Sequence, residues 1–173
     1  MSEVTEAAKA YHEDVECYRA AHFRASDSLR TWHYVVGFGL IVVSAVVSGS
    51  VLQASDGNPS HGLTLVAGVL SILVVVLTSI QTTFKLGERA ELHRSAANGF
   101  GKVLNELDVF IHRPHSNVDQ AWDELDRIVA EIGSVEAGAP GYLRRTYDKA
   151  RKQLEDDLAK RRQRGRAAQP QTP

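Results

Sequence analysis

The chain of 173 residues has a single cysteine, Cys17, which excludes an intrachain disulfide and a cysteine metal cluster. It also lacks an excess of either charge, because 20 Lys and Arg against 21 Asp and Glu leave a formal net charge of −1. A balanced charge gives no reason to expect a nucleic-acid partner. The sequence contains no recognisable catalytic constellation, cofactor motif or metal-ligand set. We therefore expect a protein that is not an enzyme and that needs no cofactor or metal.

Two long segments lack Asp, Glu, Lys and Arg altogether, and they are the most informative feature of the sequence. They cover residues 32–52 and 63–84, and neither has an ionisable residue after His33. About 21 residues at about 1.5 Å per residue cross the hydrocarbon core of a bilayer, which is about 30 Å thick. The polar or amphipathic stretch before the first segment is too long for a signal peptide. The sequence therefore predicts two transmembrane helices that are retained in the mature protein.

The segment between the two spans, residues 53–62, contains no Lys or Arg, and Asp56-Gly57-Asn58-Pro59 indicates a turn. Basic residues instead flank the pair, with Arg24 and Arg30 before the first span and Lys85 and Arg89 after the second. Cytoplasmic segments carry the excess of Lys and Arg in membrane proteins. We therefore expect a multi-pass protein of the plasma (inner) membrane with both termini in the cytoplasm.

The polar segments outside the spans carry apolar residues at alternating steps of four and three. That spacing places side chains on one helix face and is typical of helices that pack against each other. We expect four such helices in an antiparallel bundle, with breaks at Pro114 and at 138–141. The four stripes are Val4, Ala8, Tyr11, Val15, Tyr18, His22, Ala25 and Leu29; Leu86, Ala90, His93, Ala97, Phe100, Leu104, Leu107 and Ile111; Val118, Trp122, Leu125, Val129 and Ile132; and Leu143, Tyr147, Ala150, Leu154 and Leu158.

The predicted fold is an all-α membrane protein. It is a two-transmembrane helical hairpin with long cytoplasmic helical extensions that form a small antiparallel bundle. Residues 1–30 form the N-terminal amphipathic helix and residues 31–84 the hairpin, with spans at 32–52 and 63–84. Residues 85–164 form the remaining cytoplasmic helices, and 165–173 a disordered tail.

Small and hydroxylated side chains recur along one face of each predicted span. Such residues let membrane helices approach closely and form hydrogen bonds. The face has two readings: it packs helices within the hairpin or between hairpins, or it lines a narrow pore in an oligomer. The pore-lining candidates are Thr64, Gly68, Ser71, Thr78 and Thr82 in the second span and Ser44 and Ser48 in the first.

Two of the seam positions in the cytoplasmic helices are histidines. His22 precedes the first span by about the same number of residues as His93 follows the second. In an antiparallel hairpin the two imidazoles should therefore lie at the same level and approach each other. Either the pair fixes helix register, or it acts as a proton-sensitive latch, because two charged imidazoles would repel. We take His22, His93 and the neighbouring seam residues Tyr18 and Phe100 as coupling candidates.

The segment after the second span, residues 89–107, resembles the corresponding segment of the SLATT domain family. Ala90, His93 and Arg94, the small residues Ala96 and Ala97, the aromatic Phe100 and then Leu104 to Glu106 correspond to the pattern of that family. The preceding hairpin, with its short uncharged turn, agrees as well. The resemblance covers about residues 10–110. SLATT proteins are two-transmembrane proteins associated with bacterial SMODS nucleotidyltransferases and SLOG nucleotide-sensing proteins.

The resemblance implies a membrane effector of an antiphage defence system, one that perforates or disrupts the membrane when a nucleotide signal arrives. It further implies a homo-oligomer in the lipid bilayer and a partner that makes or senses the nucleotide, since no nucleotide-sensing domain is recognisable here. A second hypothesis is a scaffold that leaves the membrane intact and recruits a cytoplasmic partner through its C-terminal helices. Coupled transport is disfavoured, because no ionisable residue stands at mid-membrane.

Overall fold

The computed structural model describes residues 2–55, 61–141 and 144–167, and they form five helices in sequence order. These are α1 (Ser2–Ser55), α2 (His61–Phe84), α3 (Leu86–His112), α4 (Val118–Gly138) and α5 (Arg144–Ala167). No strand occurs among the described residues, so the all-α prediction is confirmed. The predicted turn at 56–59 and residues 168–173 of the predicted tail lie outside the described part.

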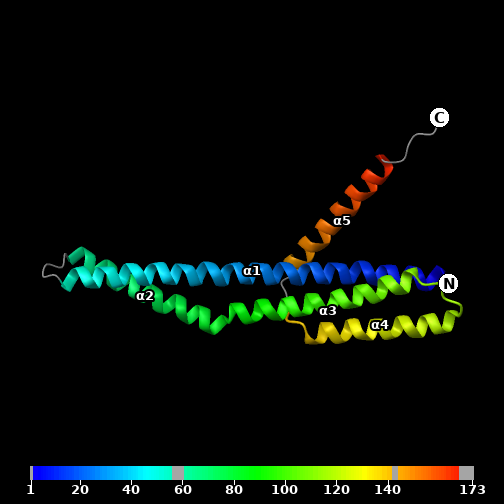
Figure 1. Ribbon diagram of the computed structural model, residues 1–173, viewed down its shortest axis with the longest axis horizontal. Helices are drawn as coiled ribbons and strands as arrows, with labels where there is room; N and C mark the ends of the chain where they lie inside the picture. Colours follow the sequence, from blue (N-terminus) through cyan, green and yellow to red (C-terminus); the bar gives the residue numbers. More distant parts are fainter. Residues whose placement is uncertain (1, 56–60, 142–143, 168–173) are drawn as a thin grey trace. The chain divides into compact units, whose positions relative to one another are not determined.

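The chain divides into two compact units, which are described separately. The bundle comprises Met1–Ser26 and Glu91–Pro173, and the hairpin comprises Asp27–Ala90. Helix α1 contributes its N-terminal half to the bundle and its C-terminal half to the hairpin. Figure 1 labels all five helices.

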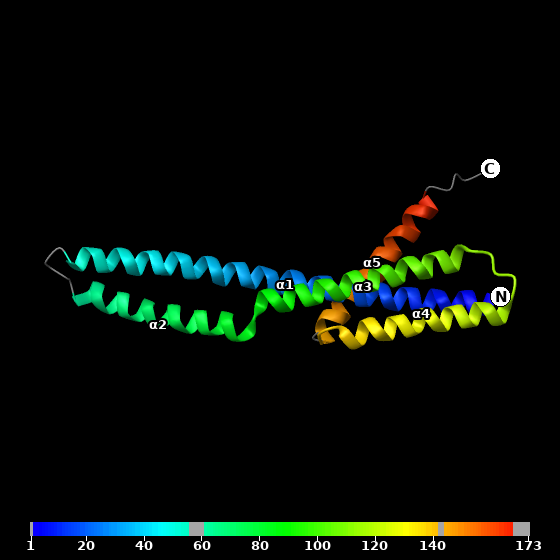
Figure 2. The same cartoon turned by 60° about the horizontal axis from the view of Figure 1, so that its bottom comes forward.

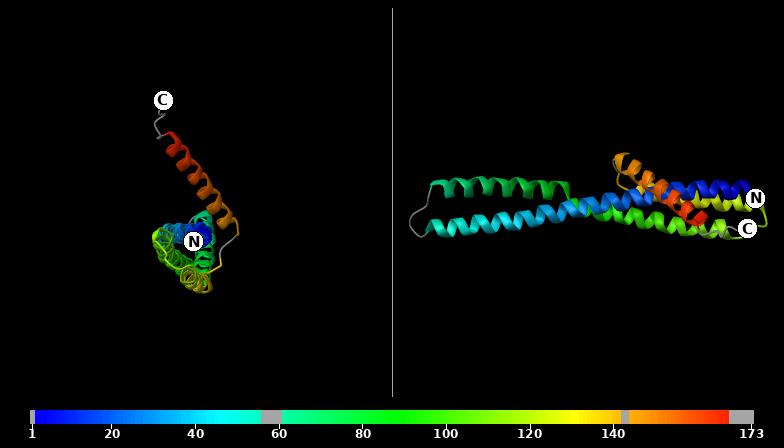
Figure 3. Two further views of the ribbon diagram at one scale, coloured as in Figure 1. Left: turned by 90° about the vertical axis from the view of Figure 1, so that its right-hand side faces the viewer. Right: turned by 90° about the horizontal axis from the view of Figure 1, so that it is seen from above.

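In the bundle, the N-terminal half of α1, α3 and α4 lie side by side, and the end-on view in Figure 3 shows them grouped around a common axis. The core between them is apolar. Because α3 packs against both neighbours, its buried face is wider than the single predicted stripe and also includes Ala96, Val103 and Phe110. The main core cluster consists of Val4, Ala8, Val15, Phe100, Val103, Leu104, Leu107, Phe110, Ala121, Leu125, Ile128 and Ile132.

Three members of the predicted stripes are exposed. In α4 the buried positions are Ala121, Leu125, Ile128 and Ile132, whereas Val118 is 41% and Trp122 36% exposed. Ala121 lets the helices approach closely, and a bulky indole at the neighbouring position stays at the edge of the core. In α1, Tyr11 is 40% exposed, although it continues the predicted seam.

The ends of α3 and α4 are fixed by local hydrogen bonds. At the C-terminus of α3, His112 Nδ1 donates to the carbonyl oxygen of Asp108 over 2.8 Å. At the N-terminus of α4, the side-chain oxygen of Asn117 accepts from the backbone N–H of Asp119 over 2.9 Å and of Gln120 over 3.5 Å. Asn117 is therefore a helix N-cap, which satisfies donors that have no partner within the helix.

Helix α5 is strongly charged and joins the bundle through few apolar side chains. Ala150 is buried, and the Tyr147 ring lies 5.5 Å from the ring of Tyr18 on α1. Leu154 is half-buried. The side chains of Leu143 and Leu158, which complete the fourth predicted stripe, lie outside the described residues.

The hairpin has the opposite surface character. Figure 2 shows α2 running beside the C-terminal half of α1. Large apolar side chains on the outside are exposed; for example, Phe38 is 70%, Ile41 68% and Ile72 68% exposed. The structure contains two helices long and apolar enough to cross a membrane, and the most apolar window of each has no buried residue. Lipid is the solvent in which such a surface is stable.

The two helices of the hairpin pack against each other through apolar side chains and one polar side chain of α2, Gln81. The half-buried side chains of α2 recur at steps of three and four and belong to Ala67, Leu70, Val74, Leu77 and Gln81. A Cβ atom added at Gly37 of α1 would lie 3.6 Å from Nε2 of Gln81, so Gly37 lies where the two helices approach closely.

Candidate functional site: an outward hydroxyl face and a buried histidine pair

The seven pore-lining candidates lie on the outside of the single hairpin. Each of them is exposed, and a Cβ added at Gly68 would meet no atom within 4 Å. This face therefore does not hold α1 and α2 together, and only contacts outside the single chain remain open to it. The residues concerned are Ser44, Ser48, Thr64, Gly68, Ser71, Thr78 and Thr82.

The hydroxyls of this face are bonded to their own helices. In α2, Ser71, Thr78 and Thr82 each donate to the carbonyl oxygen four residues earlier over 2.8 Å. In α1, Ser48 donates to the carbonyl oxygen of Ser44 over 2.9 Å. A hydroxyl satisfied in this way tolerates lipid, and its oxygen can still accept a bond from water or from a neighbouring helix. A shallow groove along α2 is lined by Val74, Val75, Thr78, Ser79, Thr82 and Thr83.

The bundle contains a buried pair of histidines at the seam of α1 and α3. His22 is 1% exposed and His93 is 5% exposed, and their Nδ1 atoms are 3.0 Å apart. The ring centroids lie 5.1 Å apart with the ring planes inclined by 45°. The predicted approach of the two imidazoles is confirmed.

The short distance between the two Nδ1 atoms requires a single proton between them. One of them must donate and the other must accept, so one ring holds its proton on Nδ1 and the other does not. If both rings were protonated, two N–H donors would face each other in an apolar seam. The observed contact is therefore compatible with two neutral rings, or with a single shared charge, but not with two charges.

The surroundings of the pair disfavour protonation of even one of the two imidazoles. Burial and, as the smaller cause, the neighbouring His93 together lower the pKa of His22 from 6.5 to about 4. Burial also lowers the pKa of His93. Both imidazoles are therefore neutral at neutral pH, and the pair stabilises the packed bundle as a neutral hydrogen bond.

An aromatic cluster surrounds the pair and extends it to a third helix. The ring of His22 lies 5.6 Å from that of Phe100, which stacks on Tyr18 at 5.7 Å. Tyr18 in turn contacts Tyr147 of α5. The four predicted coupling residues thus lie in one connected cluster, with Tyr147 as a member that the seam pattern had placed only on its own stripe. A change at the histidine pair would be felt by α1, α3 and α5 together.

The sequence also matches the model of a known protein family. The model of the SMODS and SLOG-associating 2TM effector domain family 4 matches residues 9–161. The chain belongs to this family. The match of the 2TM effector domain extends beyond the residues on which the resemblance depended, because it includes α4 and most of α5. No curated protein and no solved structure is significantly similar to this 2TM effector.

One polar contact in the hairpin of the 2TM effector was missed by the sequence analysis. Gln81 Nε2 donates to His33 Nδ1 over 3.5 Å between α2 and α1. The signal was available, since Gln81 is the only amide side chain between residues 63 and 84 and His33 is the last ionisable residue of the first block. Polar residues at this depth in a membrane helix commonly pair with each other.

Proposed function

We propose that this member of the 2TM effector family is a membrane effector that assembles into a homo-oligomeric pore in a bacterial defence system. It resides in the inner membrane with both termini in the cytoplasm. The observation that carries the proposal is the outward position of the hydroxyl face. A single hairpin exposes this face, and only other copies can turn it toward water.

The composition of the face supports a pore of modest selectivity. Hydroxyls and glycine offer hydrogen-bonding oxygens and space, but no side chain of the face carries charge. Residues such as Ser71, Thr78 and Thr82 would wet the lumen, while the large apolar residues elsewhere on the hairpin would face lipid. Ions and small polar solutes are the expected permeants.

The bundle supplies the control in this proposal. Its histidine pair and aromatic cluster hold α1, α3 and α5 in the packed arrangement, which corresponds to the closed pore. A nucleotide signal, made or sensed by a partner protein, would favour a different packing, and it must bind that second packing more tightly than the first. A fall in pH acts in the same direction, because a second charge on the pair breaks the contact between the two Nδ1 atoms.

The pore is tested with the purified full-length chain in vesicles that contain no other protein, at pH 7 and near pH 4, where a second charge on the histidine pair should open it. Release of a small trapped dye and dissipation of an imposed potential are the readouts. The double variant Thr78→Val and Thr82→Val replaces two hydroxyls by methyl groups of the same shape, and we expect it to lower ion flux several-fold. Thr31→Val is the matched control, because Thr31 donates in the same way to the carbonyl oxygen of Asp27, over 2.8 Å, but lies outside the face and the groove.

Three results would contradict the pore. Vesicles that stay tight at high protein density even near pH 4 favour the scaffold hypothesis, in which the membrane remains intact and a cytoplasmic partner is recruited. Equal losses of flux in the double variant and in Thr31→Val would show that the hydroxyl face does not line the pore. A chain that stays monomeric in bilayers while it conducts would exclude the oligomer.

The coupling role of the histidines has its own test. His22→Leu with His93→Leu keeps the seam apolar and removes the hydrogen-bonded pair. If the pair is a latch, the variant loses the acid response of dye release, while the wild-type chain leaks more as the pH falls toward 4. If dye release and its pH dependence stay unchanged, the pair only fixes the register of the helices.

A further inference from the structure

The backbone between α2 and α3 adopts a conformation that its residue disfavours. Lys85 stands between Phe84, the last residue of α2, and Leu86, the first of α3, and its φ angle is 43°. Among the residues that the structure describes, it is the one non-glycine residue with a positive φ. The left-handed region is readily adopted by glycine but is disfavoured for a residue with a Cβ atom. The chain therefore bends here at a conformational cost.

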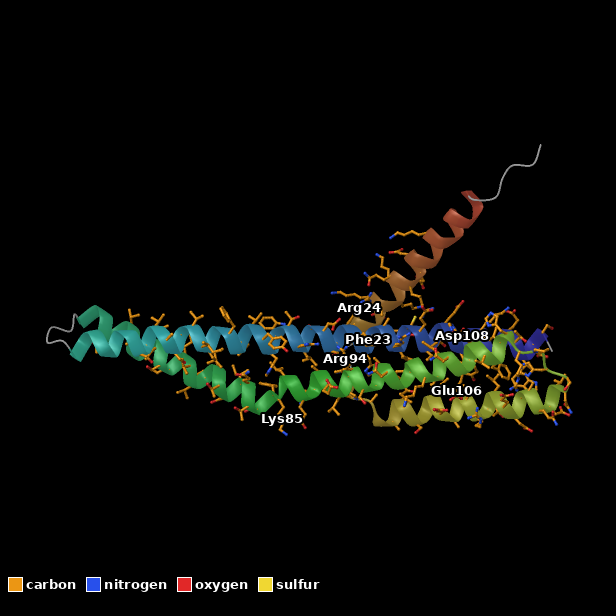
Figure 4. The ribbon with its side chains drawn as sticks, in the orientation of Figure 1. Phe23, Arg24, Lys85, Arg94, Glu106 and Asp108 are labelled. Atoms are coloured by element: carbon orange, nitrogen blue, oxygen red, sulfur yellow. The ribbon has the colours of Figure 1, made fainter. Side chains whose placement is uncertain are left out.

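Hydrogen bonds continue on both sides of this residue. The N–H of Lys85 donates to the carbonyl oxygen of Gln81 over 3.2 Å, and the N–H of Arg89 donates to the carbonyl oxygen of Lys85 over 3.0 Å. Lys85 itself projects outward from the bend (Figure 4) and pairs with Glu88 at 2.9 Å on the surface. The bend is thus a local event at one residue, flanked by intact helix.

The ring of His33 contacts residues on both sides of the bend. Its Nδ1 accepts from Gln81, which belongs to α2. A Cβ atom added at Gly87, in the first turn of α3, would lie 3.5 Å from Cε1 of the same ring. One side chain of α1 therefore touches the helix before Lys85 and the helix after it.

The last turns of α2 are weakened by hydroxyl side chains that bond to the helix backbone. Thr78, Ser79 and Thr82 all donate their hydroxyls to the carbonyl oxygen four residues earlier, over 2.8 Å each. A Ser or Thr bonded to the helix backbone in this way slightly destabilises the helix and often bends it. The three side chains lie within the two turns that precede Lys85.

We propose that Lys85 is the hinge about which the second span turns against the start of α3, and that His33 is the positioning residue that holds the bent arrangement. In the alternative arrangement Lys85 takes the helical conformation, and α2 and α3 join into one continuous helix. His33 cannot then keep its contacts with both Gln81 and Gly87. The functional consequence rests on the proposed pore: the bent form is closed, and straightening turns the hydroxyl face of α2 and opens it.

The size of the expected effect follows from the residue at the hinge. A residue with a Cβ atom adopts the left-handed conformation less readily than glycine, by a factor of about five or more. Lys85→Gly removes this penalty and also disfavours a continuous helix. It should shift the equilibrium toward the bent form by at least about five-fold. His33→Ala removes the contacts across the bend and should shift the equilibrium toward the straight form.

The hinge is measured directly with two spin labels on the full chain in lipid nanodiscs, in a Cys17→Ala background. Cysteines at Ile72 and Arg89, both exposed, place one label on each side of Lys85 within the hairpin. The two positions are 17 residues apart, so an unbroken helix separates their backbones by about 25 Å. In the wild-type chain we expect the main distance between the labels to be shorter than this. In Lys85→Gly the distribution should be narrower around the short distance, and in His33→Ala its main distance should be near about 25 Å.

Lys85→Ala is the matched control. It removes the ammonium group and the ion pair with Glu88 but keeps a Cβ atom at the hinge, so its distances should follow the wild-type chain rather than Lys85→Gly. The hinge is wrong if the wild-type chain already shows the distance of a straight helix. It is also wrong if Lys85→Gly and His33→Ala leave the distribution unchanged.

Dye release from vesicles separates the hinge from the pore. Lower release in Lys85→Gly and higher release in His33→Ala, with the distances shifting as expected, support both. Shifted distances with vesicles that never leak keep the hinge and reject the proposed pore. Leaking vesicles with unshifted distances keep the pore and reject the hinge.

Discussion

Phe100 and Phe38 are chemically identical side chains in two different environments, the core of the bundle and the outer surface of the hairpin. Phe100 lies in the bundle and is 1% exposed, whereas Phe38 lies in the hairpin and is 70% exposed. In water the burial of apolar surface drives the bundle together. In lipid that force is absent, so helices associate through close packing and through polar contacts such as that of Gln81 with His33. The comparison indicates that the bundle is held by its apolar core, while the hairpin depends on the close packing and polar contacts of its two helices.

The sharpest way to break this comparison is to make one substitution in both places. Phe100→Ala empties a buried site, and we expect it to destabilise the bundle by about 3–5 kcal/mol. Phe38→Ala should change bundle stability by less than about 0.5 kcal/mol. The measurement is denaturant unfolding of the full chain in nanodiscs, followed by Trp122 fluorescence in a Trp32→Phe background. Similar losses in both variants would show that the two units unfold as one.

The second prediction concerns the dependence of bundle stability on pH. His22 has a pKa of about 4 in the folded bundle and about 6.5 when unfolded, so the unfolded state takes up the proton first. The corresponding stability, of the order of 3 kcal/mol, is fully present above pH 6.5 and is lost as the pH falls toward 4. The unfolding midpoint should decline over this range.

The control for the pH prediction is the chain with His22→Leu and His93→Leu, whose midpoint should be flat between pH 6.5 and 5. An equal decline in that variant would assign the pH dependence to other groups. The helicity of the hairpin offers a second comparison, because it should not change over the pH range in which the histidine pair of the bundle titrates.

A third, smaller effect is expected at the N-terminus of α4. Asn117→Ala removes the acceptor of two backbone N–H groups and should cost about 1 kcal/mol of bundle stability. Asn98→Ala is the matched control, since Asn98 is exposed on α3 and should be neutral or slightly stabilising. Unfolding midpoints of the two variants compared with the wild-type chain decide the matter, and equal midpoints would refute the capping role.

The smallest effect should come from the ion pairs on the bundle surface. Arg127 and Glu106 join α4 to α3 at 3.2 Å, and Figure 4 labels Glu106 on α3. The Arg127 side chain is 63% exposed, so Glu106→Gln should cost less than about 0.5 kcal/mol, and less still in high salt. A loss comparable with that of Phe100→Ala would mean that charge, rather than the apolar core, holds the helices of the bundle together.

Several features follow from local patterns in the chain. The period of the apolar residues along Leu86–Ile111 places one face of α3 in the core, because a helix repeats its faces every three to four residues. The approach of His22 and His93 follows from their equal distances to the spans. The exposure of Trp122 and the burial of Ala121 could not be derived in this way, since they depend on how closely two helices approach.

The amino-acid sequence by itself determined that the chain has two membrane-spanning helices and helical segments with apolar seams, because the length and period of apolar runs are local properties. Only the tertiary structure decided that the hydroxyl face turns outward, that Gln81 and His33 meet, and that the chain bends at Lys85. Each of these depends on the rotation of one helix against another or on a backbone angle, and an amphipathic pattern constrains neither.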